Sequence, residues 1–437
     1  MSDLYLLNIL KQIWAEMKVF KFGGASVNSI ARIQQLALII KEQTNGPLVM
    51  VISAMGKTTN ALELIANAFY GNEKDTALER FHVLKEEHLL VAKQLLEKRW
   101  HHCESQLADF FTEIEWLLHD KPVRHFDYYY DQIVCLGELL SSCIVSHYLQ
   151  EVGVENEWLD ARDLIRTDNN FRDANIDWEI STQKIQASIQ LNNTGSANIV
   201  VTQGYIAATD DNESTTLGRE GSDYSAAIIA HILHAESLTI WKDVAAVMNG
   251  DPKAFPDAVL IPTLSYSEVI EMAYYGAQVI HPKTIKPLQN KQIPLYVKCF
   301  LDTSLLGTTI HQLPVKNLPP IIVIKQNQVM VTMNTQDYSF VADQHIIELY
   351  SLFEKLHVKP NLMQTTAISV LICMDDYSDK INQLASAASG VFDVQIEKGL
   401  TLLTIRHYNE SVIKTQIENK KILLQQQTKE TVQVLYQ

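Results

Sequence analysis

The stretch T-T-L-G-R-E-G-S-D-Y-S-A-A, Thr215–Ala227, has the pattern of a glycine-broken loop that leads into a helix. The apolar run Ile199–Ile206 precedes it and predicts a strand, and the run Ser225–Ala235 has helical composition. Gly218 and Gly221 permit backbone conformations and close approaches that side chains would block. The predicted order is therefore strand, glycine loop and helix start.

The polar residues of this loop are suited to hold an anion. Ser222 or Asp223 fits a helix cap, and the first amides of a helix attract anions. Arg219 adds a planar cation that matches a carboxylate or a phosphate. An ordinary turn with a helix cap explains the same residues, and from this stretch alone it is the better explanation.

The composition is that of a soluble globular protein. The chain has 437 residues, enough for two or three domains, with 47% hydrophobic and 20% charged residues. Its 36 basic and 51 acidic residues give a net charge of -15, which argues against a nucleic-acid partner. No apolar run is as long as a membrane span, and no signal peptide is expected. We therefore expect a cytoplasmic protein with no membrane partner.

The five cysteines predict free thiols rather than a disulfide framework. They are scattered along the chain without a C-x-x-C pair, which also argues against a zinc site, so we expect no metal ligands among them. They are Cys103, Cys135, Cys143, Cys299 and Cys373.

Repeated strand–loop–helix patterns predict an α/β fold with a mostly parallel sheet sandwiched by helices. Strands are expected at Lys18–Phe22 and Leu48–Ile52, and helices at Ser29–Lys41 and Ala61–Tyr70. Further strands are expected at 199–201, 238–241 and 295–300. Long helices are expected at 75–119 and 131–150, and a loop and helix at 262–285.

Three residues or loops stand out within these elements. Lys21 ends a strand before Gly23 and Gly24, and such a loop exposes amides that can hold phosphate oxygens. Glu138 interrupts an apolar helix, where an unpaired carboxylate is costly; an internal cation is the ordinary explanation and a substrate ammonium the alternative. Asp243 follows a strand, at the sheet edge where α/β proteins bind ligands, although turn aspartates are common there.

Several well-known site motifs are absent. The sequence contains no G-x-x-x-x-G-K-[ST], no G-x-G-x-x-G after a strand and no H-E-x-x-H. His281, in H-P-K, is expected to be a structural cap.

Six motifs occur in one order: K-F-G-G-A-S at Lys21, S-A-M-G-K-T-T-N at Ser53, L-G-E-L-L-S-S at Leu136, T-L-G-R-E-G-S-D-Y-S-A at Thr216, W-K-D-V-A-A-V at Trp241 and G-A-Q-V-I-H-P at Gly276. Together they resemble the aspartate kinases, of the amino-acid-kinase fold, over roughly Lys18–Leu313. The C-terminal part of the chain, residues 320–437 (the tail), resembles the ACT-type regulatory region of the same family.

The resemblance implies transfer of the γ-phosphate of MgATP to the β-carboxylate of L-aspartate, giving 4-phospho-L-aspartate, the first step of lysine, threonine and methionine biosynthesis. A carboxylate needs no general base at pH 7, so catalysis rests on alignment and charge neutralisation. By resemblance, Lys21 reaches the transferring phosphate and Asp223 organises that lysine. The implied aspartate-binding residues are Thr59, Glu138 for the ammonium, Arg219 for the α-carboxylate, and Ser222.

The resemblance also assigns residues to ATP, which binds with Mg²⁺. They are Lys21, Gly23, Gly24, Lys242, Asp243, Met248, Lys253, Gln278 and Val279. The family usually has Thr where Lys242 stands, Tyr where Met248 stands and Lys where Gln278 stands. The missing cation at Gln278 predicts a modestly raised KM for ATP, with Lys242 and Lys253 as candidates to compensate.

Three domains are expected: an N-terminal extension over residues 1–17, the catalytic domain over 18–315 and an ACT-like domain over 320–437. The linker is Lys316–Pro320, where the composition changes. The tail is short for two ACT modules, so one ACT-like unit is expected, with extra strands at 421–424 and 431–435.

The resemblance implies an amino-acid effector, lysine or threonine, in the tail. The matching positions are Met333, Phe340, Asn361 and Thr365. Asn361 stands where the family usually has an aspartate, which weakens this expectation. ACT modules commonly pair through their sheets, so a homodimer or higher homo-oligomer is expected.

Two other functions remain open. Another amino-acid kinase, for glutamate or acetylglutamate, would share the fold, but Glu138 and R-E-G-S-D favour aspartate. A non-catalytic amino-acid sensor is supported by Gln278 and opposed by the intact Lys21, Asp223 and Arg219. A fused homoserine dehydrogenase is not expected, because the dinucleotide fingerprint is missing.

Overall fold

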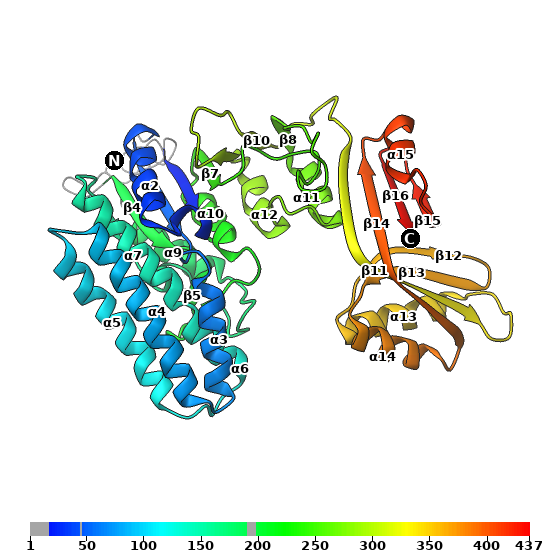
Figure 1. Ribbon diagram of the computed structural model, residues 1–437, viewed down its shortest axis with the longest axis horizontal. Helices are drawn as coiled ribbons and strands as arrows, with labels where there is room; N and C mark the ends of the chain where they lie inside the picture. Colours follow the sequence, from blue (N-terminus) through cyan, green and yellow to red (C-terminus); the bar gives the residue numbers. More distant parts are fainter. Residues whose placement is uncertain (1–16, 44–45, 190–197) are drawn as a thin grey trace, which may run out of the picture. The chain divides into compact units, whose positions relative to one another are not determined.

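The computed structural model describes residues 17–43, 46–189 and 198–437, which divide into two compact units (Figure 1). The first unit contains the chain up to Val247, then Pro262–Ile270 and Ile280–Pro314. The second contains Met248–Ile261, Glu271–Val279 and Val315–Gln437. The predicted N-terminal extension lies outside the described residues except for Met17, which is buried.

An eight-stranded sheet forms the centre of the first unit. Its order is β3-β4-β2-β1-β7-β9-β10-β8, and all neighbours run parallel except β9 and β10, which confirms the predicted mostly parallel sheet. The strands are β1 Lys18–Phe22, β2 Leu48–Ile52, β3 Glu157–Trp158, β4 Ile199–Gln203, β7 Ser237–Lys242, β8 Thr263–Ser265, β9 Leu295–Cys299 and β10 Thr308–His311. A separate antiparallel pair is formed by β5 Ile206–Ala208 and β6 Ser214–Thr216.

Helices cover both faces of this sheet. The helices of this part of the chain are η1 Gly24–Val27, α2 Ile30–Gln43, α3 Thr58–Tyr70, α4 Lys74–Leu95, α5 Trp100–His119, α6 Phe126–Val134, α7 Leu136–Glu151, α8 Ala161–Leu164, α9 Trp178–Ser188, α10 Gly221–Ile232, α11 Tyr266–Tyr275 and α12 Pro282–Lys291. The second half of α11, from Glu271, belongs to the second unit. Phe20 and Phe22 of β1 join a core that includes α2, α3 and α7. Because side chains alternate along a strand, Lys21 points to the other face, where α10 contacts β1, β2 and β7.

Two predicted helices are each interrupted in the structure. The run 75–119 forms α4 and α5, separated by a turn at residues 96–99, and these helices lie side by side (Figure 1). The backbone N–H groups of Lys98 and Arg99 donate to the Glu151 carboxylate of α7, at 3.2 and 2.8 Å, and so receive a cap from a distant helix. The predicted helix 131–150 is divided at Cys135 between α6 and α7.

The sequence predicted no apolar run long enough for a membrane span. This prediction is wrong when length and composition are the only criteria. The run Phe126–Glu151 meets both criteria, and 83% of its most apolar window is buried inside the protein. The core helix of a soluble protein passes the same test. Here α7 packs against α2, α5, β2 and β4.

The second unit is built on a six-stranded antiparallel sheet of order β12-β13-β11-β14-β16-β15. The strands are β11 Ile321–Thr335, β12 Pro360–Thr365, β13 Ser369–Asp375, β14 Phe392–Arg406, β15 Ile422–Gln427 and β16 Thr431–Tyr436, and the helices are α13 Asp343–Leu356, α14 Ser378–Ala388 and α15 Glu410–Ile417. The two extra C-terminal strands are confirmed. Strand β14 runs without interruption over fifteen residues, from Phe392 to Arg406.

Three apolar clusters hold this second sheet and its helices together. Leu349 and Phe353 of α13 and Leu384 of α14 pack on β11 and β13. Ile413 of α15 packs on Ile405 of β14 and on β16. A third cluster joins residues of all six strands, among them Met330, Leu362, Cys373, Leu402, Leu424 and Leu435. This arrangement confirms a small α+β domain at the C-terminal end.

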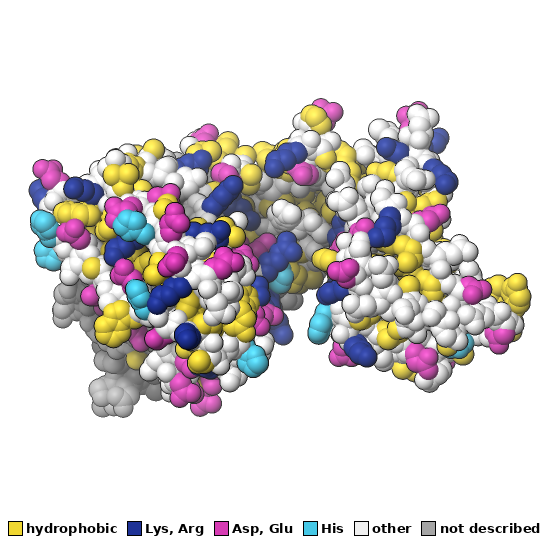
Figure 2. Space-filling view, turned by 60° about the horizontal axis from the view of Figure 1, so that its bottom comes forward, with side chains coloured by type: hydrophobic (Ala, Val, Ile, Leu, Met, Phe, Trp, Pro, Cys, Tyr) yellow, Lys and Arg dark blue, Asp and Glu magenta, His cyan; other side chains and the backbone are white. Residues whose placement is uncertain are grey.

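The face in Figure 2 carries basic and acidic side chains interspersed with apolar ones. No large field of a single sign is visible on that face, in keeping with the mixed charges of the sequence.

Candidate active site

A pocket of about 620 Å³ opens in the first unit at the carboxyl ends of parallel strands. Lys21 of β1, Ser53 directly after β2 and Lys242 at the end of β7 all line it. This is the edge at which open α/β sheets bind their ligands. The predicted site residues that the pocket brings together are Lys21, Gly23, Gly24, Thr59, Glu138, Arg219, Ser222, Asp223, Lys242 and Asp243.

An ion pair joins the sheet to α10 at the base of the pocket. Lys21 Nζ lies 2.7 Å from Asp223 Oδ1, and the two side chains are only 12% and 6% exposed. Burial alone would raise the pKa of Asp223, but the charges of Lys21 and Lys242 hold it below its ordinary value. Asp223 is therefore a carboxylate near neutral pH, and it fixes the Lys21 ammonium inside the pocket.

The glycine turn after β1 lies directly against the loop after β2. Gly56 N donates to Gly24 O at 3.0 Å, and Ser53 N donates to Phe22 O at 3.1 Å. A Cβ atom on Gly24 would lie 2.7 Å from Ala54 O, closer than side chains normally come. Gly24 is thus required by the close approach of two backbone segments, and η1 begins at this residue, beside Lys21.

Glu138 is a buried carboxylate with an unsatisfied oxygen. Its Oε1 accepts a hydrogen bond from Ala54 N at 3.2 Å, whereas Oε2 is buried without a hydrogen-bond partner. Burial raises the pKa of Glu138 to about 8, and the Ala54 hydrogen bond and the Lys21 charge oppose this only in part. The residue is 3% exposed and lines the pocket, so a cation that enters the pocket would satisfy Oε2. The ordinary explanation for this carboxylate was an ion pair with an internal Lys or Arg. Among the described residues, Glu138 forms no such ion pair.

The turn before α10 presents Arg219 to the pocket. Gly218 has a φ of 76° and Glu220 a φ of 55°, so the chain bends sharply on both sides of Arg219. A Cβ atom on Gly218 would lie 2.4 Å from Asp173 Oδ1, which leaves no room for a side chain. The Arg219 side chain is exposed and lines the pocket, so it is accessible to a ligand from solution.

A buried carboxylate, Asp131, anchors the strand that leads into this turn. Its two oxygens accept from Thr216 Oγ1 at 2.7 Å, from Thr216 N at 2.9 Å and from Arg172 N at 2.9 Å. Burial raises the pKa of Asp131 to about 6 despite these hydrogen bonds. Asp131 therefore ties α6 to β6 and to the loop of Arg172.

Sequence reasoning missed three residues that line the pocket: Tyr130, Arg172 and Tyr205. The Arg172 guanidinium lies over the Tyr130 ring, 4.3 Å from its centroid, and also pairs with Asp127 at 3.2 Å. The run D-Y-Y-Y-D, just before the helix of Glu138, was the available signal. No sequence pattern marked Arg172, because a loop distant from every motif brings it to the pocket.

Four predicted ATP-binding residues belong to the second unit rather than to this pocket. Met248 and Lys253 lie on the segment Met248–Ile261, and Gln278 and Val279 on Glu271–Val279. Their role stays a prediction. His281, in contrast, is a helix cap as expected: its Nδ1 accepts from Lys283 N at 3.2 Å at the start of α12.

The four predicted effector residues all belong to the second unit. Met333 is buried in β11 among the residues that pack against α13, while Phe340 is 78% exposed. Asn361 of β12 accepts a hydrogen bond from Lys325 Nζ at 2.7 Å and donates to Gln328 Oε1 at 2.8 Å. Its amide is thus engaged inside the domain, and Thr365 ends the same strand.

Comparisons with known proteins identify the family of this chain. Residues 16–299 match the amino acid kinase family. The chain is 28% identical to lysine-sensitive aspartokinase 3 of Escherichia coli, covering 90% of this chain and 87% of that protein. It is 33% identical to a chloroplastic bifunctional aspartokinase/homoserine dehydrogenase of Arabidopsis thaliana, over 72% of this chain but only 35% of the relative's length.

The fold is also similar to solved structures. The crystal structure of E. coli aspartokinase III with aspartate and ADP superposes with a TM-score of 0.79, at 24% identity and 96% coverage of both chains. The aspartate kinase of Clostridium acetobutylicum gives a TM-score of 0.77, at 20% identity and the same coverage.

Proposed function

This chain belongs to the amino acid kinase family, and we propose that it is an aspartate kinase, which transfers the γ-phosphate of MgATP to the β-carboxylate of L-aspartate. The observation that carries the proposal is the buried Oε2 of Glu138, which lacks a hydrogen-bond partner inside a pocket that also holds the Lys21–Asp223 ion pair. A carboxylate so buried favours a ligand with an ammonium group. The aspartokinase names of the relatives support the same substrate.

The two charged ends of aspartate have separate partners in this proposal. Glu138 receives the ammonium, and the fork of Arg219 receives the α-carboxylate. Thr59 and Ser222 line the same pocket and complete the polar contacts. The β-carboxylate then extends toward Lys21.

Phosphoryl transfer needs alignment and charge neutralisation more than covalent chemistry. The aspartate carboxylate is already ionised, so no residue has to remove a proton from it. Lys21 neutralises charge on the transferring phosphoryl group, and Asp223 keeps the ammonium in position at 2.7 Å. The amides of the Gly23–Gly24 turn, which lines the pocket, are proposed as backbone donors for phosphate oxygens.

ATP and Mg²⁺ complete the proposed site. Magnesium usually binds through substrate phosphates and one or two carboxylates, and Asp223 and Asp243 are carboxylates that line the pocket. When bound, the ion neutralises phosphate charge. Lys242 and Asp243, at the end of β7, are proposed for the nucleotide, with Met248, Lys253, Gln278 and Val279 assigned by resemblance only.

The test is aspartate-dependent release of ADP by the purified full chain. We expect turnover with L-aspartate, and loss of turnover in Lys21→Ala. Glutamate and N-acetylglutamate serve as competing substrates: acetylation removes the ammonium that Glu138 would bind. Turnover with N-acetylglutamate but not with aspartate would identify a different amino-acid kinase, and no turnover with any of them would favour a non-catalytic sensor.

The second unit is proposed as an ACT-like regulatory domain that responds to lysine or threonine. One relative is named lysine-sensitive, which supports lysine. Activity across millimolar lysine and threonine tests this, and a flat curve for both would contradict it. A homodimer, measured by light scattering, and a reducing cytoplasmic location, consistent with five free cysteines, belong to the same proposal.

A further inference from the structure

A second arginine of the pocket, Arg172, has no role in the function proposed above. It lies on the loop between α8 and α9 and lines the pocket together with Glu138 and Arg219. Guanidinium groups pair with carboxylates, and Arg219 is already proposed for a carboxylate of the substrate. Arg172 is therefore a candidate for the same ligand.

The backbone of Arg172 has a conformation that arginine rarely adopts. Its φ is 70°, in the left-handed region that favours glycine and, among other residues, asparagine. Tyr205 and Glu220, with φ of 69° and 55°, also line the pocket. Such conformations gather at active sites and ligand clamps, where the surrounding structure holds them. Glycine or asparagine would suit this backbone better, so the reason for an arginine has to lie in its side chain.

The ion pair of the Arg172 side chain contributes little to stability. Its Nη1 lies 3.2 Å from Asp127 Oδ1, and the two side chains are 44% and 55% exposed. Exposed pairs of this kind are weak because water screens both charges. The guanidinium also lies 4.3 Å from the centroid of the Tyr130 ring, and Tyr130 lines the pocket. A ligand carboxylate can thus replace Asp127 at little cost while the contact with Tyr130 stays.

Two backbone contacts place Arg172 next to the turn of Arg219. The Arg172 N–H donates to Asp131 Oδ2 at 2.9 Å, which fixes the loop from one side. On the other side, a Cβ atom on Gly218 would lie 3.3 Å from the Arg172 carbonyl oxygen, so the two segments touch. Gly218 directly precedes Arg219, and the two arginines therefore belong to adjacent segments of one pocket.

Tyr205 relates Arg172 to the carboxylate proposed for the substrate ammonium. Burial raises the pKa of Tyr205, and the nearby Tyr130 and Glu138 add to this effect. Tyr205 thus lies near both Glu138 and the ring that the Arg172 guanidinium contacts. In an amino acid the ammonium and the α-carboxylate are attached to one carbon atom. A cation close to both Glu138 and Arg219 is therefore in reach of the α-carboxylate.

On the basis of the aspartate kinase function proposed above, we propose that Arg172 is a second substrate-binding arginine, specific for the α-carboxylate of aspartate. In the free protein its guanidinium pairs with Asp127. When aspartate binds, the guanidinium turns from Asp127 to the α-carboxylate, which Arg219 holds as well, and it keeps its contact with Tyr130. The two arginines together favour a free α-carboxylate over an uncharged α-amide.

A purely structural role for the pair of Arg172 and Asp127 is the competing explanation. In that case, loss of either partner should lower the Tm, and the two losses should be similar. In the proposed role, Asp127 competes with the substrate for the guanidinium. Loss of Asp127 should then not weaken substrate binding, whereas loss of Arg172 should.

The main variant is Arg172→Asn, because asparagine accepts a positive φ and removes only the guanidinium. We expect KM for L-aspartate to rise about tenfold, with kcat and KM for ATP nearly unchanged and a Tm no lower than that of the wild type. The second probe is the α-amide of L-aspartic acid, which has no α-carboxylate. Its KM should be the same in Arg172→Asn and in the wild type.

Asp127→Ala is the matched control, since it removes the other half of the ion pair. Its KM for aspartate should not rise. Equal increases of KM for aspartate and for the α-amide in Arg172→Asn would overturn the proposal. So would a wild-type KM for aspartate in Arg172→Asn, with a lowered Tm in both variants.

A calorimetric titration with L-aspartate separates this proposal from the proposed function. If the wild type binds aspartate without phosphorylating it, the kinase function fails, and affinity about tenfold lower in Arg172→Asn would still support the role of Arg172. Equal affinity in the two proteins, or no binding to either, would overturn that role.

Discussion

Lys21 Nζ and Asp223 Oδ1 lie 2.7 Å apart, although one residue is on the first strand of the sheet and the other is in the first turn of α10. The pair exists because β1 is bordered by β2 and β7 and α10 contacts all three strands. It brings a cation and a carboxylate to the carboxyl edge of the sheet, inside the pocket.

Replacement of Lys21 should affect catalysis more than substrate binding. Lys21→Ala removes the cation proposed to neutralise the transferring phosphoryl group, and loss of one such group typically lowers kcat by about 10²–10³-fold. Asp223→Asn, which leaves Lys21 but loosens its position, should give a smaller decrease. Steady-state kinetics with both substrates measures this; a Lys21→Ala enzyme with wild-type kcat would contradict the assignment.

The affinity for aspartate should increase with pH up to about pH 8, because Glu138 must be ionised to hold an ammonium group. Its pKa of about 8 in the free protein means that a proton competes with the substrate at lower pH. Below that value, kcat/KM for aspartate should fall by about tenfold per pH unit. In Glu138→Gln this slope should disappear and KM should rise. A wild-type profile that is flat between pH 6 and 8 would argue against Glu138.

Glu138 should also influence stability in a pH-dependent way. Its pKa is raised from an ordinary 4.5 to about 8, so the folded state binds the proton more tightly than the unfolded state. Its contribution to the free energy of unfolding is therefore fully present below pH 4.5 and is lost as the pH rises through about 8. Relative to the wild type, Glu138→Gln should gain stability between about pH 5 and about pH 9 in denaturant unfolding. A difference that is constant with pH would mean that Glu138 is ionised throughout.

Replacement of Arg219 should change KM for aspartate but not KM for ATP. Arg219→Ala removes a forked, charge-assisted contact with the α-carboxylate, worth about 1.5–3 kcal/mol, so KM for aspartate should rise roughly 10–100-fold. KM for ATP should change little. Arg219→Lys keeps the charge without the fork and should be intermediate. Equal effects on both KM values would indicate a general disturbance of the turn.

Asp131 should be a positioning residue for the same turn. Asp131→Ala leaves the N–H groups of Thr216 and Arg172 without their acceptor, at about 1–3 kcal/mol for the buried Thr216 group. The free energy of unfolding should fall, and KM for aspartate should rise with it. Asp131→Asn retains an acceptor oxygen, so its free energy of unfolding and its KM for aspartate should both be close to the wild-type values. If the alanine variant loses stability with an unchanged KM, the residue supports the fold alone.

The sequence was sufficient for the parts of the fold that local patterns determine. The continuous apolar run L-V-M-V-I predicted β2, and the alternation of K-V-F-K-F predicted β1. The turn between α4 and α5 could not be predicted, because L-L-E-K-R-W contains neither glycine nor proline. The cap of α5 comes from Glu151, more than fifty positions later in the chain.

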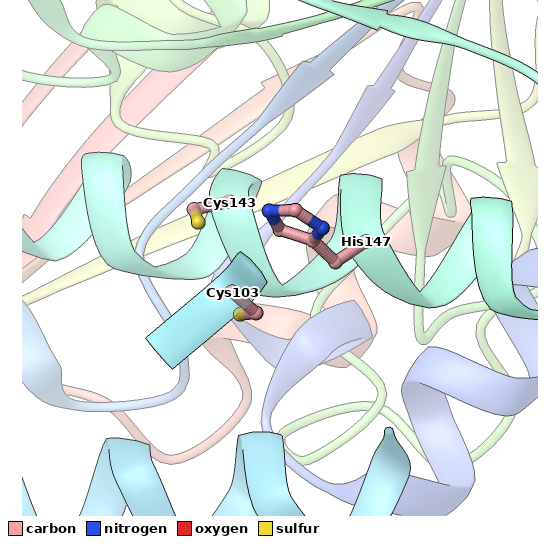
Figure 3. A group of neighbouring side chains, drawn as sticks. All are labelled: Cys103, Cys143 and His147. Carbon is pink, nitrogen blue, oxygen red and sulfur yellow. The ribbon is translucent and has the colours of Figure 1, made fainter. Parts of the chain in front are cut away.

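The site was predictable where a motif carried it. Lys21, Glu138 and Asp223 each belong to one of the six motifs, and all three line one pocket. The local sequence alone favoured a helix cap at Asp223 and an internal cation at Glu138. Arg172 and Tyr205 were missed, since each reaches the pocket through the folding of a loop. Cys103, Cys143 and His147 each offer one side-chain atom within 4.8 Å of the other two (Figure 3). Spacing along the sequence could not group them, because they come from two helices, α5 and α7, that meet only in the folded protein.

The burial of all five cysteines has a practical consequence for labelling. A folded chain without an exposed native thiol can receive a new surface cysteine and be conjugated to a dye without prior removal of the others. One such position in each unit, for example at Trp116 and at Tyr350, both exposed, would provide a donor and acceptor pair for fluorescence energy transfer. The distance between the units could then be followed during turnover and in the presence of amino acids.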